Sequence, residues 1–374
     1  MSQTNNKHIL SLATMQTVAV VIIVLTHYWF HEAWYYIGSV CVSFCFAYSG
    51  YFTARLHPFD SSYGFRSHLR FMWSKVCKLY PLHVLGIALG ILSAYLMWNV
   101  TAVNLKILLA HLTLTSSWID SQEYYFGLNS VAWYVCDLFF LYLVAPWVVR
   151  GLRAMSIGMQ VVLLIMLCLI EFVLGYSDEP ATGGIVLNTY YLFQFPPIRL
   201  LDYCAGIILF NVTRLSLWKD AERWLTPNRA TIVELGAIAI AIVLYGPCKD
   251  FLFDHCYRAA CNAMPIVMVL LGTFVLTTGC NGLVSRILSF KPLVAFSSLT
   301  TRFTCYRWAY ISRCCRCSNS GVSPSIPCLT CWYNWRLCSW SHGSYTAATR
   351  YRCRDCSHRL TTDCRPEPRL QTAT

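Results

Sequence analysis

Residues 157–176 read Ile-Gly-Met-Gln-Val-Val-Leu-Leu-Ile-Met-Leu-Cys-Leu-Ile-Glu-Phe-Val-Leu-Gly-Tyr, twenty residues with a single charge, at Glu171. A helix of about 20 apolar residues matches the thickness of the hydrocarbon core of a bilayer. Further apolar runs fill residues 9–30, 35–54, 80–99, 129–149, 197–213, 230–247 and 262–280, with weaker ones at 104–118 and 285–299. No soluble core could bury so many. The sequence therefore predicts an all-α fold, a polytopic integral membrane helical bundle of about eight to ten transmembrane helices.

The composition agrees with a membrane protein. Hydrophobic residues make up 56% of the chain and charged residues 12%, whereas an ordinary soluble protein carries about 25% charged residues. The mean hydropathy is +0.48. The first apolar run has no small-residue cleavage site and continues into His27-Tyr-Trp-Phe30, so we expect a retained first span rather than a signal peptide. A soluble enzyme and a nucleic-acid-binding protein are both disfavoured.

Charges between the apolar runs alternate in sign. Cations crowd residues 55–78 and follow the fourth run at Arg150 and Arg153, whereas Asp120 and Glu123 lie in an alternate loop. Because cytoplasmic loops carry an excess of Lys and Arg, the pattern predicts a multi-pass protein of the cell inner or plasma membrane with a cytoplasmic N-terminus. The prediction requires that residues 104–118 do not cross.

Ionisable side chains inside apolar runs are costly and often functional. His27 ends the first run, where an imidazole in an interfacial aromatic belt is the simpler interpretation, and Asp137 lies well within the fourth run. Arg199 and Asp202 are three residues apart, so they share a helix face and can pair. Glu171 is equally compatible with an interfacial and a functional acid. Three other groups favour structural roles: Glu234 as a solvated acid near a helix start, and His83 and His111 as packing residues.

A cationic motif, Lys75-Val-Cys-Lys78-Leu-Tyr-Pro81, follows the second run. Two lysines three apart lie on one face of a short helix, which we expect Pro81 to redirect. The lysines could neutralise the phosphates of a cytosolic ligand. An ordinary positive-inside flank explains the same charges.

Six short stretches carry a resemblance to a known family. They are Gln16 to His27, Cys45-Phe-Ala-Tyr-Ser-Gly50-Tyr-Phe52, Lys75 to Pro81, Asn129-Ser-Val-Ala-Trp133, Arg199-Leu-Leu-Asp-Tyr-Cys-Ala-Gly206 and Lys291-Pro-Leu-Val294. In this order they resemble the acyltransferase-3 family of polytopic membrane enzymes, which O-acylate sugars and glycans. Gln16 stands where the family has an Arg eleven residues before its His, and Lys75 and Lys78 stand where it has two arginines.

The resemblance implies transfer of a short, acetyl-like acyl group from acyl-CoA, a co-substrate, to a hydroxyl of a carbohydrate or glycan; no cofactor or metal is expected. It implies that His27 is the general base and that Lys75 and Lys78 hold the phosphates of the donor. Asp137 would orient or charge-balance the imidazole if the two spans adjoin. Arg199 would stabilise developing negative charge or pair with Asp202. Gln16 donates hydrogen bonds but carries no charge, so a step that needs the family's Arg is weakened.

The succession of apolar runs ends near Leu299. Residues 301–374 hold ten of the 20 cysteines, 11 arginines, three acids and no lysine. We therefore divide the chain into a membrane acyltransferase domain, 1–299, and an atypical tail, 300–374. Three origins remain open for the tail: a zinc module on Cys328, Cys331, Cys353 and Cys356, a disulfide-rich domain, or a disordered, out-of-frame reading of a missing last span. A single-base shift turns Leu codons into Cys or Trp codons, and Ala, Pro, Thr and Ser codons into Arg codons.

Two other functions remain open from the sequence. A transporter of a small polar solute would use Asp137, Glu171 and Arg199 as relay or substrate residues. A truncated, inactive acyltransferase remnant would explain Gln16 and the tail together. In either case the lipid bilayer is the surrounding medium, and the acceptor glycan, the acyl group and the oligomeric state are not determined.

Overall fold

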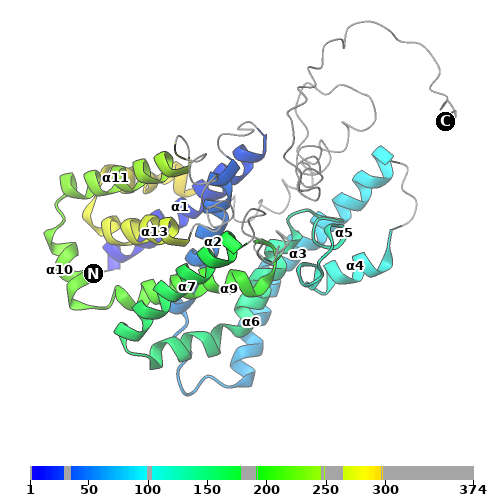
Figure 1. Ribbon diagram of the computed structural model, residues 1–374, viewed down its shortest axis with the longest axis horizontal. Coiled ribbons are helices and arrows are strands. Elements are labelled where there is room, and N and C mark those ends of the chain that lie inside the picture. The colour runs from blue at the N-terminus through cyan, green and yellow to red at the C-terminus, as the bar shows by residue number, and fades with distance from the viewer. Residues whose placement is uncertain are drawn as a thin grey trace, which may run out of the picture.

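The computed structural model describes residues 2–28, 35–98, 103–177, 191, 193–245, 248, 264–295 and 297, and across these residues it shows helices and no strand (Figure 1). The longer helices are α1 (Ser2–Tyr28), α2 (Tyr35–Leu56), α3 (Phe65–Trp98), α6 (Ala132–Ala154), α7 (Ile157–Ser177), α9 (Pro196–Val212), α11 (Pro227–Tyr245) and α13 (Met264–Thr277). The shorter ones are α4 (Leu105–Leu112), η1 (Ser116–Trp118), α5 (Gln122–Tyr125), α10 (Ser216–Trp224), η3 (Thr278–Cys280) and α14 (Leu283–Leu288). The predicted tail, residues 300–374, lies outside the described residues.

Four described helices are long and apolar enough to cross a membrane, at Ile37–Leu56, Phe65–Leu96, Ala132–Ala154 and Pro227–Tyr245. The pair α9–α10, bent by 77°, would make a fifth. Three shorter apolar helices are Ser11–Thr26, Ile157–Ile170 and Met264–Cys280. The predicted all-α membrane bundle is confirmed; a total of eight to ten crossing helices stays a prediction.

The centre of the bundle is the crossing of α2 and α9 (Figure 1). α2 also contacts α1 and α13, and α9 also contacts α6 and α7. Gly50 and Gly206 lie at this crossing: a Cβ on Gly50 would lie 2.0 Å from the carbonyl oxygen of Tyr203, and a Cβ on Gly206 would lie 1.8 Å from that of Ala47. Only glycine permits so close an approach of two helix backbones. Two of the family-like motifs therefore meet in space.

α3 corrects the prediction for residues 55–81. We expected a cationic connection with a short helix redirected at Pro81; instead one helix of 34 residues begins at Phe65 and runs through Pro81. A proline removes one hydrogen bond and can kink a helix without ending it. Lys75 and Lys78 consequently lie on the long helix itself.

Residues 104–118 do not form a membrane-length helix. α4 has eight residues, about 12 Å at 1.5 Å per residue, and is followed by a turn and by η1. The side chain of Asn104 accepts a hydrogen bond from the backbone N–H of Lys106 and thereby caps α4. The condition attached to the orientation prediction is met.

Two arginines at the end of α6 hold the loop between α2 and α3. Arg150 donates from Nε to the carbonyl of Phe59 at 2.8 Å and from Nη2 to that of Tyr63 at 2.9 Å. Arg153 donates to the carbonyls of Ala54, at 2.7 Å, and Pro58. The end of α2, the start of α3 and the end of α6 therefore lie at the same end of the bundle.

Glu234 on α11 is not the solvated acid that we expected. Its side chain is fully buried and accepts hydrogen bonds from the backbone N–H groups of Val284, at 2.9 Å, and Ser285, at 3.3 Å, and from the Ser285 hydroxyl. A carboxylate at a helix N-terminus satisfies donors that have no partner within the helix. Glu234 therefore holds the first turn of α14 against α11.

Candidate functional site

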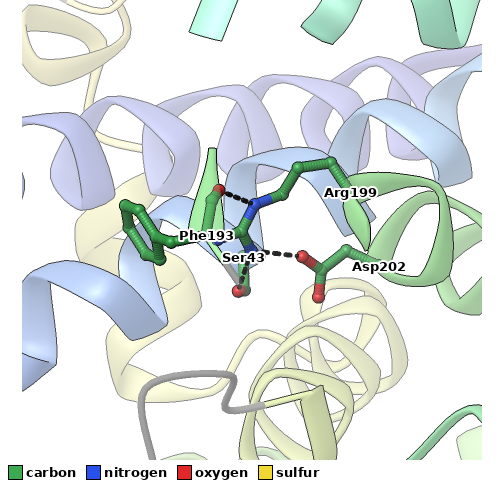
Figure 2. A network of polar contacts seen from close by, with 4 residues as sticks. All are labelled: Ser43, Phe193, Arg199 and Asp202. Carbon is green, nitrogen blue, oxygen red and sulfur yellow. Dashed lines mark hydrogen bonds and ion pairs between the residues drawn. The ribbon is translucent and has the colours of Figure 1, made fainter. Parts of the chain in front are cut away.

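Arg199 is the most buried of the described lysines and arginines, with a side chain that is 1% exposed. α9 begins after Phe195 with Pro196 and Pro197, residues whose fixed φ suits the first helical turn. The guanidinium of Arg199 donates from Nη1 to Asp202 Oδ2 at 2.9 Å and to Ser43 Oγ at 3.1 Å, and from Nε to the carbonyl of Phe193 at 2.8 Å (Figure 2). The predicted pairing of Arg199 with Asp202 is confirmed. Ser43 comes from α2, so the network joins the two central helices.

Aromatic rings enclose the same guanidinium. Its central carbon lies 4.4 Å from the ring centroid of Phe193 and 5.5 Å from that of Phe46. Trp133, near the start of α6, contacts both rings, at 5.3 Å and 6.4 Å between centroids. A cation over an aromatic face is stabilised most where water is excluded. The charge is therefore held by one carboxylate, one hydroxyl, one carbonyl and two rings.

Some polar atoms of this cluster have no hydrogen-bond partner in the described part of the chain. They are Nη2 of Arg199, Oδ1 of Asp202 and both carboxyl oxygens of Asp137. Asp137 lies one turn after Trp133 on α6 and is fully buried. The hydroxyl of Ser117 in η1 lies near enough to act on its carboxyl group as a hydrogen-bond donor, and Arg199 acts on it through its charge. Asp137 and Arg199, 62 positions apart in the printed sequence, therefore belong to one buried polar cluster.

The position of His27 is described only along the backbone. His27 lies in the last turn of α1, and its side chain lies outside the described residues. The preceding residue, Thr26, lies against Gly38 of α2, where an added Cβ would come within 2.6 Å of the Thr26 hydroxyl. Ser43 is five residues further along α2, about 7.5 Å along the helix axis. α2 thus connects the end of α1 with the network around Arg199.

The first and fourth predicted spans, α1 and α6, are linked through α2. α1 packs against α2, α13 and α14, whereas α6 packs against α9, α3 and η1. α2 contacts both α1 and α6. The role expected for Asp137, to orient or charge-balance the His27 imidazole, stays a prediction.

Lys75 and Lys78 lie one turn apart on α3 at the end of the bundle that carries the loop after α2. The Nζ of Lys75 lies 4.4 Å from the ring centroid of Tyr142 and 5.0 Å from that of Phe71; Lys78 is exposed. Burial lowers the pKa of His57, in this loop, and the charges of Lys75 and Lys78 lower it further. Three basic groups therefore act on one another at this rim, as an anion site requires.

His83 and His111, each expected only as a packing residue, are both buried and contact each other. Their rings stack with centroids 6.5 Å apart, and the Nε2 of His83 donates to the carbonyl of His111 at 2.8 Å. Neither ring nitrogen of His111 meets hydrogen-bond geometry with a described group, although the backbone of Tyr124 is near enough to favour the protonated ring.

Several residues of the cluster could not be predicted from the sequence. Ser43, Phe193 and Ser117 are neutral residues of common types, and nothing in their spacing marks them. The side chain of Glu171 lies outside the described residues. Among the described residues, no group of three or more His, Cys, Asp or Glu side chains could hold a metal ion.

Comparison with known proteins identifies the family of this chain. The sequence model of a family described as "Acyltransferase domain" matches residues 9–302. The chain is 24% identical over 194 residues to Acyltransferase MdmB of Streptomyces mycarofaciens, and the matched stretch covers 49% of each protein. The chain thus spans about half the length of this curated relative. No solved structure gives a significant match.

Proposed function

Because the chain belongs to the acyltransferase-3 family of membrane acyltransferases, we propose that it transfers a short acyl group from acyl-CoA to a hydroxyl of a carbohydrate or glycan. His27 is the general base of this proposal. Its imidazole takes the proton of the acceptor hydroxyl while the oxygen attacks the thioester carbonyl carbon. The C–S bond then breaks, and the CoA thiolate takes the proton from the imidazolium. Acyl-CoA is consumed as a co-substrate.

The observation that supports this proposal most is the buried cluster of Arg199, Asp202, Ser43 and Asp137. A buried charge is costly, so such groups inside a bundle mark functional sites more often than structural ones. α2 links this cluster to the end of α1, where His27 lies. Arg199 is therefore proposed to stabilise the negative charge that develops on the carbonyl oxygen.

The rim formed by His57, Lys75 and Lys78 supports a polyanionic donor. The two rings that hold Lys75 orient its ammonium group, and no carboxylate within salt-bridge distance of either lysine occurs among the described residues. Phosphate groups of CoA supply the missing negative charge. On the predicted orientation this rim faces the cytoplasm, where acyl-CoA is present.

Transfer of label from radiolabelled acetyl-CoA to a glycan acceptor in purified membranes tests the proposal. His27→Ala should abolish transfer at an unchanged amount of protein in the membrane, whereas His68→Ala, a change on α3 near Trp147, should leave it. Lys75→Gln with Lys78→Gln should raise KM for acetyl-CoA about tenfold, with Lys→Arg at both positions retaining wild-type KM. Full transfer by His27→Ala would contradict the proposal. Uptake of a solute without acyl transfer would favour a transporter.

A further inference from the structure

Two buried side chains of the cluster, Arg199 and Asp137, have atoms that no described group satisfies. Neither Nη2 of Arg199 nor either oxygen of Asp137 meets hydrogen-bond geometry with a described group, although the Ser117 hydroxyl lies near enough to Asp137 to act on it; the two side chains are 1% and 0% exposed. More than nine in ten buried polar groups in proteins are hydrogen-bonded. Asp137 lies one turn after Trp133 on α6, and the ring of Trp133 contacts both rings that cover the guanidinium of Arg199, so these atoms lie in the same region of the bundle. A ligand with a hydrogen-bonding group would satisfy these atoms.

The charges of the cluster decide which kind of ligand fits. Asp202 lies 2.9 Å from Arg199 and balances its charge. Asp137 would be a second carboxylate beside a single guanidinium, and the polar neighbour that acts on it besides Arg199 is the neutral hydroxyl of Ser117. An uncompensated buried carboxylate is strongly unfavourable, so a carboxyl in this setting holds its proton. A protonated carboxyl group has an O–H donor. Arg199 and Asp137 then offer two hydrogen-bond donors, and the matching ligand group is a hydrogen-bond acceptor.

We propose that the neutral carboxyl group of Asp137 and the Nη2 of Arg199 form the binding subsite for the carbonyl oxygen of the acyl group. The subsite rests on the proposed function and adds Asp137 as a catalytic residue in contact with the reacting atoms. When the acceptor oxygen adds to the carbonyl carbon, the π electron pair moves onto the carbonyl oxygen, and both donors hydrogen-bond to the resulting oxyanion. The pair returns as the C–S bond breaks. The proton of Asp137 stays on Asp137 throughout.

The surrounding helices suit this role. A carboxylic acid kept neutral by an apolar setting is an effective oxyanion donor, and donors held in advance lose no energy to reorganisation. Asp137 lies on α6 and Arg199 on α9, two helices that pack directly. Trp133, one turn before Asp137, covers the rings of Phe46 and Phe193. These rings keep water from the guanidinium.

Infrared spectroscopy of the full chain in nanodiscs tests the subsite without turnover. The carbonyl stretch of a protonated carboxyl should be present in the wild type, absent from Asp137→Asn and retained in Asp202→Asn. A ketone analogue of acetyl-CoA, with CH₂ inserted between sulfur and carbonyl, should shift the band to lower frequency, whereas CoA itself should not. Asp137→Glu is the second variant and should move the band without removing it.

Steady-state kinetics of Asp137 variants test the subsite independently of the infrared band. Asp137→Leu should lower kcat about 10²- to 10³-fold with KM for acetyl-CoA within about twofold, and Asp137→Asn, which keeps a donor, should recover most of the loss. The inference is overturned if the wild type lacks the carbonyl band of a protonated carboxyl, or if the ketone analogue does not shift that band. A band shifted by the analogue in a wild type that transfers no acyl group supports the subsite and overturns the proposed function instead.

Discussion

Arg199 and Asp202 form a buried ion pair whose partners depend on each other. Removing one partner leaves the other as an uncompensated buried charge, so Arg199→Met should lower the free energy of unfolding by about 3–5 kcal/mol. The double variant Arg199→Met/Asp202→Leu should lose less than the single one. Unfolding in mixed micelles measures both. The control is Arg223→Met: Arg223 pairs with Asp220 at 3.1 Å with the same spacing of three residues, but the two side chains are 79% and 60% exposed, so we expect a loss below about 1 kcal/mol.

His111 should make the protein sensitive to acid. Burial, and then the neighbouring His83, lower the pKa of His111 to about 4, from an ordinary value of about 6.5. The neutral ring is therefore favoured in the fold, and its contribution is complete above about pH 6.5 and is lost as the pH falls towards 4. The shift corresponds to about 3 kcal/mol at most.

Thermal unfolding between pH 7 and pH 4 checks this dependence. His111→Phe keeps a ring beside His83 and removes the titration, so its Tm should fall less than that of the wild type over this range. Lys106→Gln, on the exposed side of the same helix, should follow the wild type. Parallel curves for His111→Phe and the wild type would mean that another group controls the acid response.

At the residue scale, sequence reasoning succeeds where the partner is local. The spacing of Arg199 and Asp202 predicts their contact because a helix turn brings residues three apart together. The prediction for Glu234 is wrong for the opposite reason: the N–H groups whose hydrogen bonds it accepts belong to residues 50 and 51 positions later, and no local pattern marks them. Ser43 likewise reaches Arg199 only because two helices cross.

The crossing of α2 and α9 depends on Gly50, at the scale of whole helices. Gly50→Ala would place a methyl group 2.0 Å from the carbonyl oxygen of Tyr203, so the helices must separate, at a cost of about 1–3 kcal/mol. Gly151→Ala on α6 is the matched control, because nothing lies within 4 Å of its added Cβ. Both changes gain the same helix propensity, and the control should be neutral or slightly stabilised. Equal Tm values for the two variants would contradict the close approach.

Apolar periodicity predicts helices well in this chain and predicts their ends poorly. The runs from residue 35 and from residue 129 correspond to α2 and α6 within a few residues. α3 begins fifteen residues before the predicted run at residue 80. The prediction is wrong because it interprets the charges of Arg66, Arg70, Lys75 and Lys78 as marking a loop. Long cationic side chains are compatible with a helix, so charge density marks a membrane boundary rather than a helix end.

For the whole molecule, the sequence predicts the class and the family but not the arrangement. Apolar runs and ordered motifs predict a helical membrane protein of the acyltransferase-3 family, since both are local patterns. The packing of α1 on α2, the bend of 77° between α9 and α10 and the contact between His83 of α3 and His111 of α4 depend on segments that are distant in sequence. The placement of Asp137 and Arg199 in one buried cluster depends on those contacts as well.

The orientation of the bundle is the remaining prediction at this scale. Arg150 and Arg153 bind the loop that precedes Arg66 and Arg70, so these cations gather at one end, whereas Asp120 and Glu123 lie in the segment between α3 and α6. By the positive-inside rule the cationic end faces the cytoplasm. An epitope inserted at Ser62 should bind antibody only in permeabilised cells, and one at Gln122 should bind it in intact cells. Both residues are exposed, so an epitope inserted at either one is accessible to antibody. Antibody access to Ser62 in intact cells would show the opposite orientation. The rim with Lys75 and Lys78 would then face away from the cytoplasm, where the proposed acyl-CoA donor is present.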